Sequence, residues 1–244
     1  MPDLTILHTN DLHGKLSDRI AERIALEKSS AEHCLLLDAG DAISSGNIYY
    51  RPGGEPVLAR MNELGYDAMA MGNREFHFLG RGLKSKVKLA KFPILCANLH
   101  SDLDLGPSVV PSIILDLGRK IGIFGLTVPM ITKRMTVSKL SPFWFEDPMK
   151  AARDLVPELK SQADLLIALT HTGLKADMEL AQSAPGIDII VGGHTHAVLD
   201  EPVMVGETWI VQAGSWGRYL GRVDVSGTRI SGKLIDMRSD GVVE

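Results

Sequence analysis

Short apolar runs that alternate with helical patterns constrain the fold of this 244-residue chain more than any other feature of its sequence. Runs such as LTILH, HCLLLD and DLLIALTH have the length and branched residues of buried strands. Between such runs lie segments whose apolar residues recur at helical spacing, at 17–30, 56–65, 83–91, 147–163 and 176–184. Strands that alternate with helices are typical of α/β folds. We therefore expect an α/β fold over most of the chain.

The ends of several elements are also marked in the sequence. Ser17 precedes the first helical pattern, and Asp147 followed by Pro148 opens the fourth. Ser and Asp cap helices well and Pro is favoured in the first turn, so we expect helices to begin at these points. Segments 112–118 and 120–128 predict a β-hairpin, and from Pro202 onward the pattern becomes short strands joined at glycines.

Composition excludes some functional classes. The formal net charge is −4, so non-specific binding of nucleic acid is not expected. No apolar run approaches the roughly 20 residues that span a bilayer, and the start MPDLTILHTND lacks the basic and apolar parts of a signal peptide. Cys34 and Cys96 lie in apolar runs, which indicates buried free thiols and a cytoplasmic location. With no repeat and no linker, we expect a single domain over residues 1–244.

The apolar strands repeatedly end in side chains that can bind a metal ion. Ligands of open α/β folds gather at the carboxyl ends of the strands, whereas core strands do not need polar ends for stability. The candidate ligands are Asp11, His13, Asp41, Asn73, His171, His194 and His196.

Each motif is weak when it is taken alone. Asp11-Leu12-His13 also fits a turn with a solvated His, Gly40-Asp41 fits a turn or a helix cap, and Gly72-Asn73 is a common turn pair. His194-Thr195-His196 after two glycines is more specific, because both imidazoles face the same side of an extended segment. All of them in this order, each after an apolar strand, indicate a site for two metal ions.

Five motifs together resemble those of the calcineurin-like metallophosphoesterases, and most of all the N-terminal domain of the 5′-nucleotidase group. These motifs are ILHTNDLHG, LLLDAGD, MGNREF, LTHTG and VGGHTH, and VQAGSWGRYLG extends the resemblance to nearly the whole chain. The resemblance implies a four-layer αββα sandwich of two mixed β-sheets flanked by helices. It also implies hydrolysis of phosphoric esters by a metal-bound hydroxide, with a small phosphorylated molecule such as a nucleotide as the substrate.

The resemblance further implies which residues hold each ion. One ion is assigned to Asp11, His13 and His196. The other is assigned to Asn73, His171 and His194, and Asp41 bridges the two. Mixed nitrogen and oxygen ligands suit two divalent metal ions such as Mn, Fe, Co or Zn.

The segment after Asn73 departs from the family pattern. The family usually has a catalytic His at the next position, where this chain has Arg74. Arg can hold phosphoryl oxygens but cannot act as a general acid near neutral pH. His77 lies three residues on and would share a face with Arg74 if a helix began here, so both are candidate catalytic residues. The alternatives are a structural ion pair for Arg74, a surface location for His77, and for Glu75 a supporting role rather than a ligand role.

Because the resemblance covers the N-terminal domain of the 5′-nucleotidase group, we expect a chain without the C-terminal nucleotide-binding domain that members of this group carry. Aromatic residues of the chain itself could instead wall a substrate pocket, although most aromatic residues belong to cores. The candidates, which lie in segments that look like loops, are Trp144, Phe145, Trp216 and Tyr219.

Three functions are compatible with these observations. The first is a phosphoric ester hydrolase, either a monoesterase or a diesterase. The second is a metal-binding module with little turnover, because Arg74 replaces the catalytic His. The third is a hydrolase of a sulfur ester, an activity found in a related branch of the family.

Overall fold

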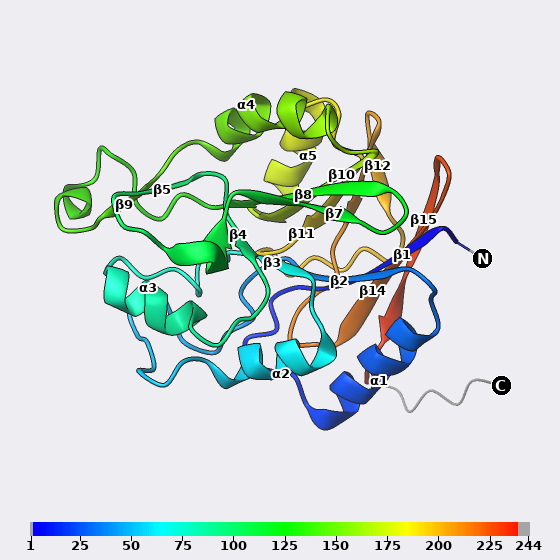
Figure 1. Ribbon diagram of the computed structural model, residues 1–244, viewed down its shortest axis with the longest axis horizontal. Helices are drawn as coiled ribbons and strands as arrows, with labels where there is room; N and C mark the ends of the chain where they lie inside the picture. The colour runs from blue at the N-terminus through cyan, green and yellow to red at the C-terminus, as the bar shows by residue number, and fades with distance from the viewer. Residues whose placement is uncertain (1, 239–244) are drawn as a thin grey trace.

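Two β-sheets pack face to face in the middle of the protein, and helices cover both outer faces (Figure 1). The structure is a computed structural model that describes residues 2–238. The α/β fold and the four-layer arrangement of two mixed sheets flanked by helices are as predicted. In the described residues, no helix is both long and apolar enough to cross a membrane.

The first sheet has seven strands, and its central strands are parallel. β14 joins it antiparallel to β1, and β15 pairs antiparallel with β14. In spatial order the strands are β15 (Arg229–Asp236), β14 (Tyr219–Ser226), β1 (Leu4–Thr9), β2 (Cys34–Asp38), β3 (Ala68–Ala70), β4 (Ile94–Leu95) and β6 (Val109–Val110).

The second sheet has six strands, with four parallel strands between two antiparallel edge strands. In spatial order they are β12 (Val203–Val205), β13 (Thr208–Val211), β11 (Ile189–Gly192), β10 (Leu165–His171), β8 (Lys120–Thr127) and β7 (Ser112–Asp116). A separate antiparallel pair is formed by β5 (Leu99–Ser101) and β9 (Phe143–Phe145).

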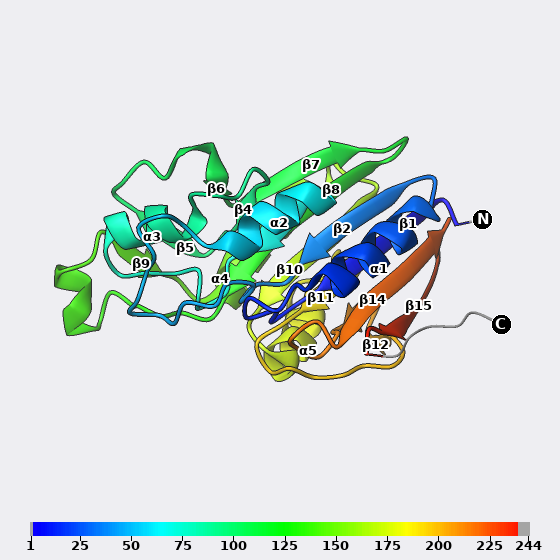
Figure 2. The ribbon, with the colours of Figure 1, turned by 90° about the horizontal axis from the view of Figure 1, so that it is seen from below.

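The helices bury their apolar sides against the outer faces of the sheets. α1 (Asp18–Ser29) and α2 (Pro56–Leu64) lie across the first sheet, as Figure 2 shows, and share a buried cluster with its strands. α4 (Pro148–Lys160) and α5 (Leu174–Ser183) cover the second sheet. α3 (Gly80–Val87) packs near β4 and β9, and two short 3₁₀ helices span Gly106–Ser108 and Thr136–Lys139. A third cluster, made of apolar side chains alone, fills the space between the sheets.

The predicted element boundaries hold where the sequence marks them. Ser17 caps α1 by accepting a hydrogen bond from the backbone N–H of Ile20, and Asp147 caps α4 in the same way through Lys150. Pro148 is the first residue of α4. The predicted hairpin is formed by β7 and β8, which pair antiparallel.

Three expectations about side chains need correction. Trp144 and Phe145 lie on the strand β9 rather than in a loop, and Phe145 is buried. Tyr219 is the first residue of β14. Cys34 is only partly buried, whereas Cys96 is buried, and both are free thiols. Three-residue strands are too short to show an alternating pattern, which is why β9 looks like a loop in the sequence.

Gly125 on β8 lies where the two sheets come into backbone contact. A Cβ atom at this position would lie 2.1 Å from the carbonyl oxygen of Leu95 on β4. The backbone cannot easily move away, because the carbonyl of Gly125 accepts a hydrogen bond from Ala97 and its N–H donates to Pro111. The separation of the sheets at this point therefore requires a residue without a side chain.

We expect Gly125→Ala to lower the free energy of unfolding by about 3 kcal/mol or more, because the core has no room for a methyl group here. Chemical denaturation would measure the loss. Gly53→Ala is the matched control, since nothing lies within 4 Å of a Cβ atom at Gly53. Equal unfolding free energies for the two variants would contradict the close approach.

Candidate metal centre

The predicted ligands lie together at the carboxyl ends of five parallel strands. Asp11 and His13 follow β1, Asp41 follows β2, and Asn73 follows β3. His171 ends β10, and the loop after β11 carries His194 and His196. The first sheet therefore contributes four of the predicted ligands and the second sheet three, and the site lies where the two sets of loops meet.

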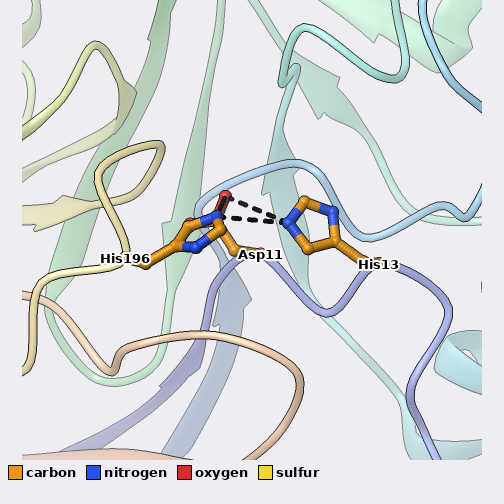
Figure 3. Close-up of side chains that lie close together, drawn as sticks. All are labelled: Asp11, His13 and His196. Carbon is orange, nitrogen blue, oxygen red and sulfur yellow. Dashed lines mark hydrogen bonds and ion pairs between the residues drawn. The ribbon is translucent and has the colours of Figure 1, made fainter.

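One group of ligand atoms is formed by Asp11, His13 and His196 (Figure 3). The Nε2 atoms of the two imidazoles lie 3.2 Å apart. Oδ1 of Asp11 lies 3.2 Å from Nε2 of His196 and 3.9 Å from Nε2 of His13. Three ligand atoms from two distant parts of the chain therefore point at one location, which is the arrangement that a metal ion requires.

A second group is formed by Asp11, Asp41 and His171. Nε2 of His171 lies 3.4 Å from Oδ1 of Asp41 and 4.0 Å from Oδ1 of Asp11. Beside this group, Nδ1 of His194 lies 3.1 Å from Oδ1 of Asn73. The two groups share Asp11, whereas the family resemblance assigns the bridge to Asp41.

The buried side-chain atoms of these groups that have no hydrogen-bond partner include Oδ1 of Asp11 and Nε2 of His171, which lie 4.0 Å apart. Burying an unpaired polar atom costs free energy, so native proteins rarely do it. A divalent cation at this point would satisfy both atoms. The carboxylate, amide and imidazole donors together suit a metal ion that accepts mixed oxygen and nitrogen ligands.

The backbone is strained at the same place. Six non-glycine residues in the described part of the chain have a positive φ angle, a conformation that most side chains disfavour. Strain of this kind persists only where the surrounding structure enforces it, and it gathers at functional sites. Five of the six are predicted metal ligands and the sixth is an aromatic residue: Asp11, His13, Asp41, His194, His196 and Trp216.

The orientation of His171 is fixed by the opposite atom of its ring. Nδ1 lies 2.8 Å from the carbonyl oxygen of Ala39, so it donates there and leaves the lone pair of Nε2 for a metal. Burial disfavours the charged imidazole, yet the neighbouring Asp41 and Asp11 carboxylates raise the pKa of His171 to about 9. A bound metal would take the place of a proton at Nε2.

Glu75 is not part of either group of ligand atoms and instead ties the loops together. Its carboxylate accepts hydrogen bonds from the backbone N–H groups of Gly72, Asp41 and Ile43. Burial raises its pKa to about 7. A Cβ atom on Gly72 would lie 2.2 Å from the backbone nitrogen of Asp41, so glycine is needed for this close approach.

Two buried residues that sequence reasoning missed also hold the site. Asp177 on α5 accepts hydrogen bonds from the hydroxyl groups of Thr170 and Thr172, which flank His171. Lys86 on α3 donates to three backbone carbonyl groups, including that of Arg74. The only signal for either residue in the sequence is a charged residue at a position where the helical pattern calls for an apolar one.

The two candidate catalytic residues have different surroundings. The backbone N–H of Arg74 donates to Oδ1 of Asp41 at 2.7 Å, and its guanidinium Nε lies 3.5 Å from Oδ2 of the same carboxylate. His77 is only 2% exposed, stacks on Phe78 and meets the edge of Tyr50. Its Nδ1 accepts a hydrogen bond from the backbone N–H of Leu79, and burial lowers its pKa.

The helix that would place Arg74 and His77 on one face does not begin at Arg74. Residues 73–75 form a turn, and α3 begins only at Gly80. Arg74 therefore contacts a predicted ligand directly, whereas the side chain of His77 is held by packing.

Comparisons with known proteins find relatives that are similar in sequence and in fold. Trifunctional nucleotide phosphoesterase YfkN of Bacillus subtilis is 35% identical over 92% of this chain and 18% of its own length. Protein UshA of Yersinia enterocolitica is 33% identical over 91% of this chain and 48% of its own length. The structure of a 5′-nucleotidase precursor from Thermus thermophilus superposes with a TM-score of 0.80 and 27% identity, covering 96% of this chain and 54% of that one.

The chain spans about half or less of the length of these relatives. The sequence profile of the calcineurin-like phosphoesterases matches residues 4–198, a range that begins with β1 and contains every predicted ligand. With that match and this fold, the chain belongs to the calcineurin-like phosphoesterase family.

Proposed function

We propose that this protein is a hydrolase of phosphoric esters that depends on two divalent metal ions and acts on small phosphorylated molecules, with nucleotides as the first candidates. The observation that carries the proposal is the pair of buried, unpaired ligand atoms on Asp11 and His171. The relatives support the reaction class, because they are named as nucleotide phosphoesterases and 5′-nucleotidases.

The proposed ligand sets follow the family pattern. Asp11, His13 and His196 hold one ion, and Asn73, His171 and His194 hold the other. Asp41, which lies next to His171 and Arg74, is the proposed bridge between the two ions. When bound, such ions supply an activated water and neutralise charge on the phosphoryl group, and Mn, Fe, Co and Zn all accept these ligands.

Arg74 is the protein cation best placed to bind the substrate phosphate. Its backbone is fixed by Asp41 and its guanidinium donates to the carbonyl oxygen of Ser44, while about a third of the side chain stays exposed. A guanidinium group can donate two parallel hydrogen bonds to phosphoryl oxygens, which orients the ester and stabilises the developing charge. His77 could serve as the proton donor to the leaving group only if its packing against Phe78 and Tyr50 changes.

The first prediction concerns the central carboxylate. Asp41→Ala should lose most bound metal and most activity while the fold survives, because the two cations would repel each other without it. Elemental analysis after loading with manganese, an assay with p-nitrophenyl phosphate and bis-p-nitrophenyl phosphate, and a thermal melt would measure the three effects. Asp200→Ala is the control, since Asp200 is exposed. A variant that retains two ions per chain would rule out the bridging role of Asp41.

The second prediction tests whether Glu75 orients the predicted metal ligands without binding metal itself. Glu75→Gln should weaken metal binding by about 10- to 100-fold, the usual effect of changing a group that orients ligands. The reason is that the amide nitrogen of Gln cannot accept the hydrogen bonds from Gly72 and Asp41. Calorimetric titration with manganese would measure the affinity. Glu63→Gln on the exposed side of α2 should behave as wild type, and equal affinities for both variants would contradict the supporting role.

The third prediction concerns Arg74 and His77. Arg74→Ala should reduce kcat/KM for p-nitrophenyl phosphate and for an alkyl phosphate alike, because both develop charge on the phosphoryl oxygens. If His77 donates a proton, His77→Ala should lose about 10²- to 10⁴-fold more activity on the alkyl phosphate, whose leaving group needs that proton. His33→Ala, at an exposed His, is the control. Equal, small effects of His77→Ala on both substrates would leave His77 as a packing residue.

A further inference from the structure

Trp216 stands beside the metal centre with much of its ring in solvent. Its indole is 41% exposed, and its centroid lies 5.5 Å from that of His196 and 6.3 Å from that of His13. Both imidazoles belong to the first group of ligand atoms. A large apolar ring would normally be buried, so its exposure next to two predicted ligands needs a reason.

The backbone of Trp216 adopts a conformation that residues with side chains disfavour, and this conformation fixes the position of the ring. Trp216 has a φ angle of 59°, and its N–H donates to the carbonyl oxygen of Asp11 at 2.8 Å. Gly217 follows with a φ angle of 64°, and a Cβ atom there would lie 3.0 Å from the carbonyl oxygen of Lys15. The loop is thus fixed both to a predicted ligand and to the segment that follows β1. Among the non-glycine residues with positive φ in the part of the chain that the structure describes, Trp216 is the one that is not a predicted metal ligand.

An open hollow of about 490 Å³ lies on this side of the metal centre, between the segment after His13 and the Trp216 loop. Leu16 and Ile20 contribute apolar surface to it, and Lys15 and Arg218 contribute positive charge. The guanidinium carbon of Arg218 lies 4.5 Å from the centroid of the Trp216 ring. The hollow therefore combines an indole ring, a guanidinium group that lies over this ring, and a second basic residue, Lys15, next to the predicted metal centre.

We propose that this hollow is the subsite for the leaving group of the substrate, and that it binds the base of a nucleotide by stacking on Trp216 and Arg218. This inference rests on the proposed phosphoric ester hydrolysis. It adds that Trp216 and Arg218 select substrates that carry a base. Indole rings and guanidinium planes both stack on bases, because every base has a flat π-face. Lys15 and Arg218 favour an anionic substrate over a neutral one.

The positions of the predicted ligands and of Trp216 indicate where the phosphate, the sugar and the base of a nucleotide would lie. Trp216 lies beside His196 and also lines the hollow, so a phosphate held by Asp11, His13 and His196 would leave the rest of the ester within reach of the Trp216 ring. The sugar then spans the gap between the ligands and the ring. A substrate without a base would reach the metal centre but leave the stacking surface unused.

The experiment compares AMP with ribose 5-phosphate, which has the same ester bond and no base. Trp216→Asn removes the ring and keeps a residue that tolerates positive φ, whereas Trp216→Phe keeps an aromatic face. Arg218→Ala removes the stacked guanidinium. Tyr49→Asn is the matched control, because Tyr49 is a 59% exposed aromatic residue on a different loop. Elemental analysis of each variant checks that its metal content equals that of the wild type.

Loss of one base stack should raise KM for AMP by about tenfold or more in Trp216→Asn. The kinetics of ribose 5-phosphate should change by less than about twofold, and Trp216→Phe should lie between wild type and Trp216→Asn. Arg218→Ala should also raise KM for AMP, and Tyr49→Asn should leave the ratio of the two substrates unchanged. Equal losses on both substrates, or no loss on either, would overturn the proposal.

A failure of the proposed function would look different. In that case the wild-type protein with manganese would hydrolyse neither these two substrates nor p-nitrophenyl phosphate. The subsite would then be judged by the quenching of tryptophan fluorescence on titration with AMP. Quenching that is lost in Trp216→Asn and kept in Tyr49→Asn would support the subsite, and identical quenching in all variants would overturn it.

Discussion

The buried carboxylate of Asp11 is the constraint around which the functional end of the protein is built. One of its oxygens accepts hydrogen bonds from the side chain of Asn10 and from the backbone of His194, while the other has no partner. Its backbone N–H donates to Gly40 and its carbonyl accepts from Trp216. One residue therefore joins the loops of both sheets, and a cation could satisfy the unpaired oxygen without rearranging those loops.

Two further buried acids, Glu75 and Asp177, also hold loops together, although neither belongs to the groups of predicted ligand atoms. Glu75 joins the loops after β2 and β3, and Asp177 holds the threonines on either side of His171. Burial raises the pKa of each to about 7, which shows how strongly the interior disfavours their charge. Each accepts two or more hydrogen bonds, which offsets that cost only while the loops keep their positions. Glu75 and Asp177 thus hold the loops that carry the predicted metal ligands, and the positions of those ligands depend on both acids.

The sequence predicts what is local and leaves out what depends on distant contacts. The run DLLIALTH gives β10 because seven buried residues in a row suit a central parallel strand. The strands β5 and β9 are missed, since each has three residues and is recognised only by pairing with the other. Asp177 is marked in the sequence only as an acid at an apolar position of the helical pattern, and its burial depends on Gly192, which leaves room for its carboxylate. The link between Arg74 and His77 rested on helical spacing, but the backbone there forms a turn.

The distribution of backbone strain connects the fold to its function. A positive φ angle at a non-glycine residue costs on the order of 1–3 kcal/mol, and the described chain concentrates such residues in the loops at one end of the sandwich. The two packed sheets supply the stability that holds these loops in place. Metal binding accounts for the strained backbone at the predicted ligands but does not account for the same conformation at Trp216. Its ring faces the hollow, and its backbone is bonded to Asp11. The strained loops that bring the predicted ligands together therefore also position the aromatic ring of Trp216, so that the proposed metal centre and the proposed base subsite depend on one set of loops.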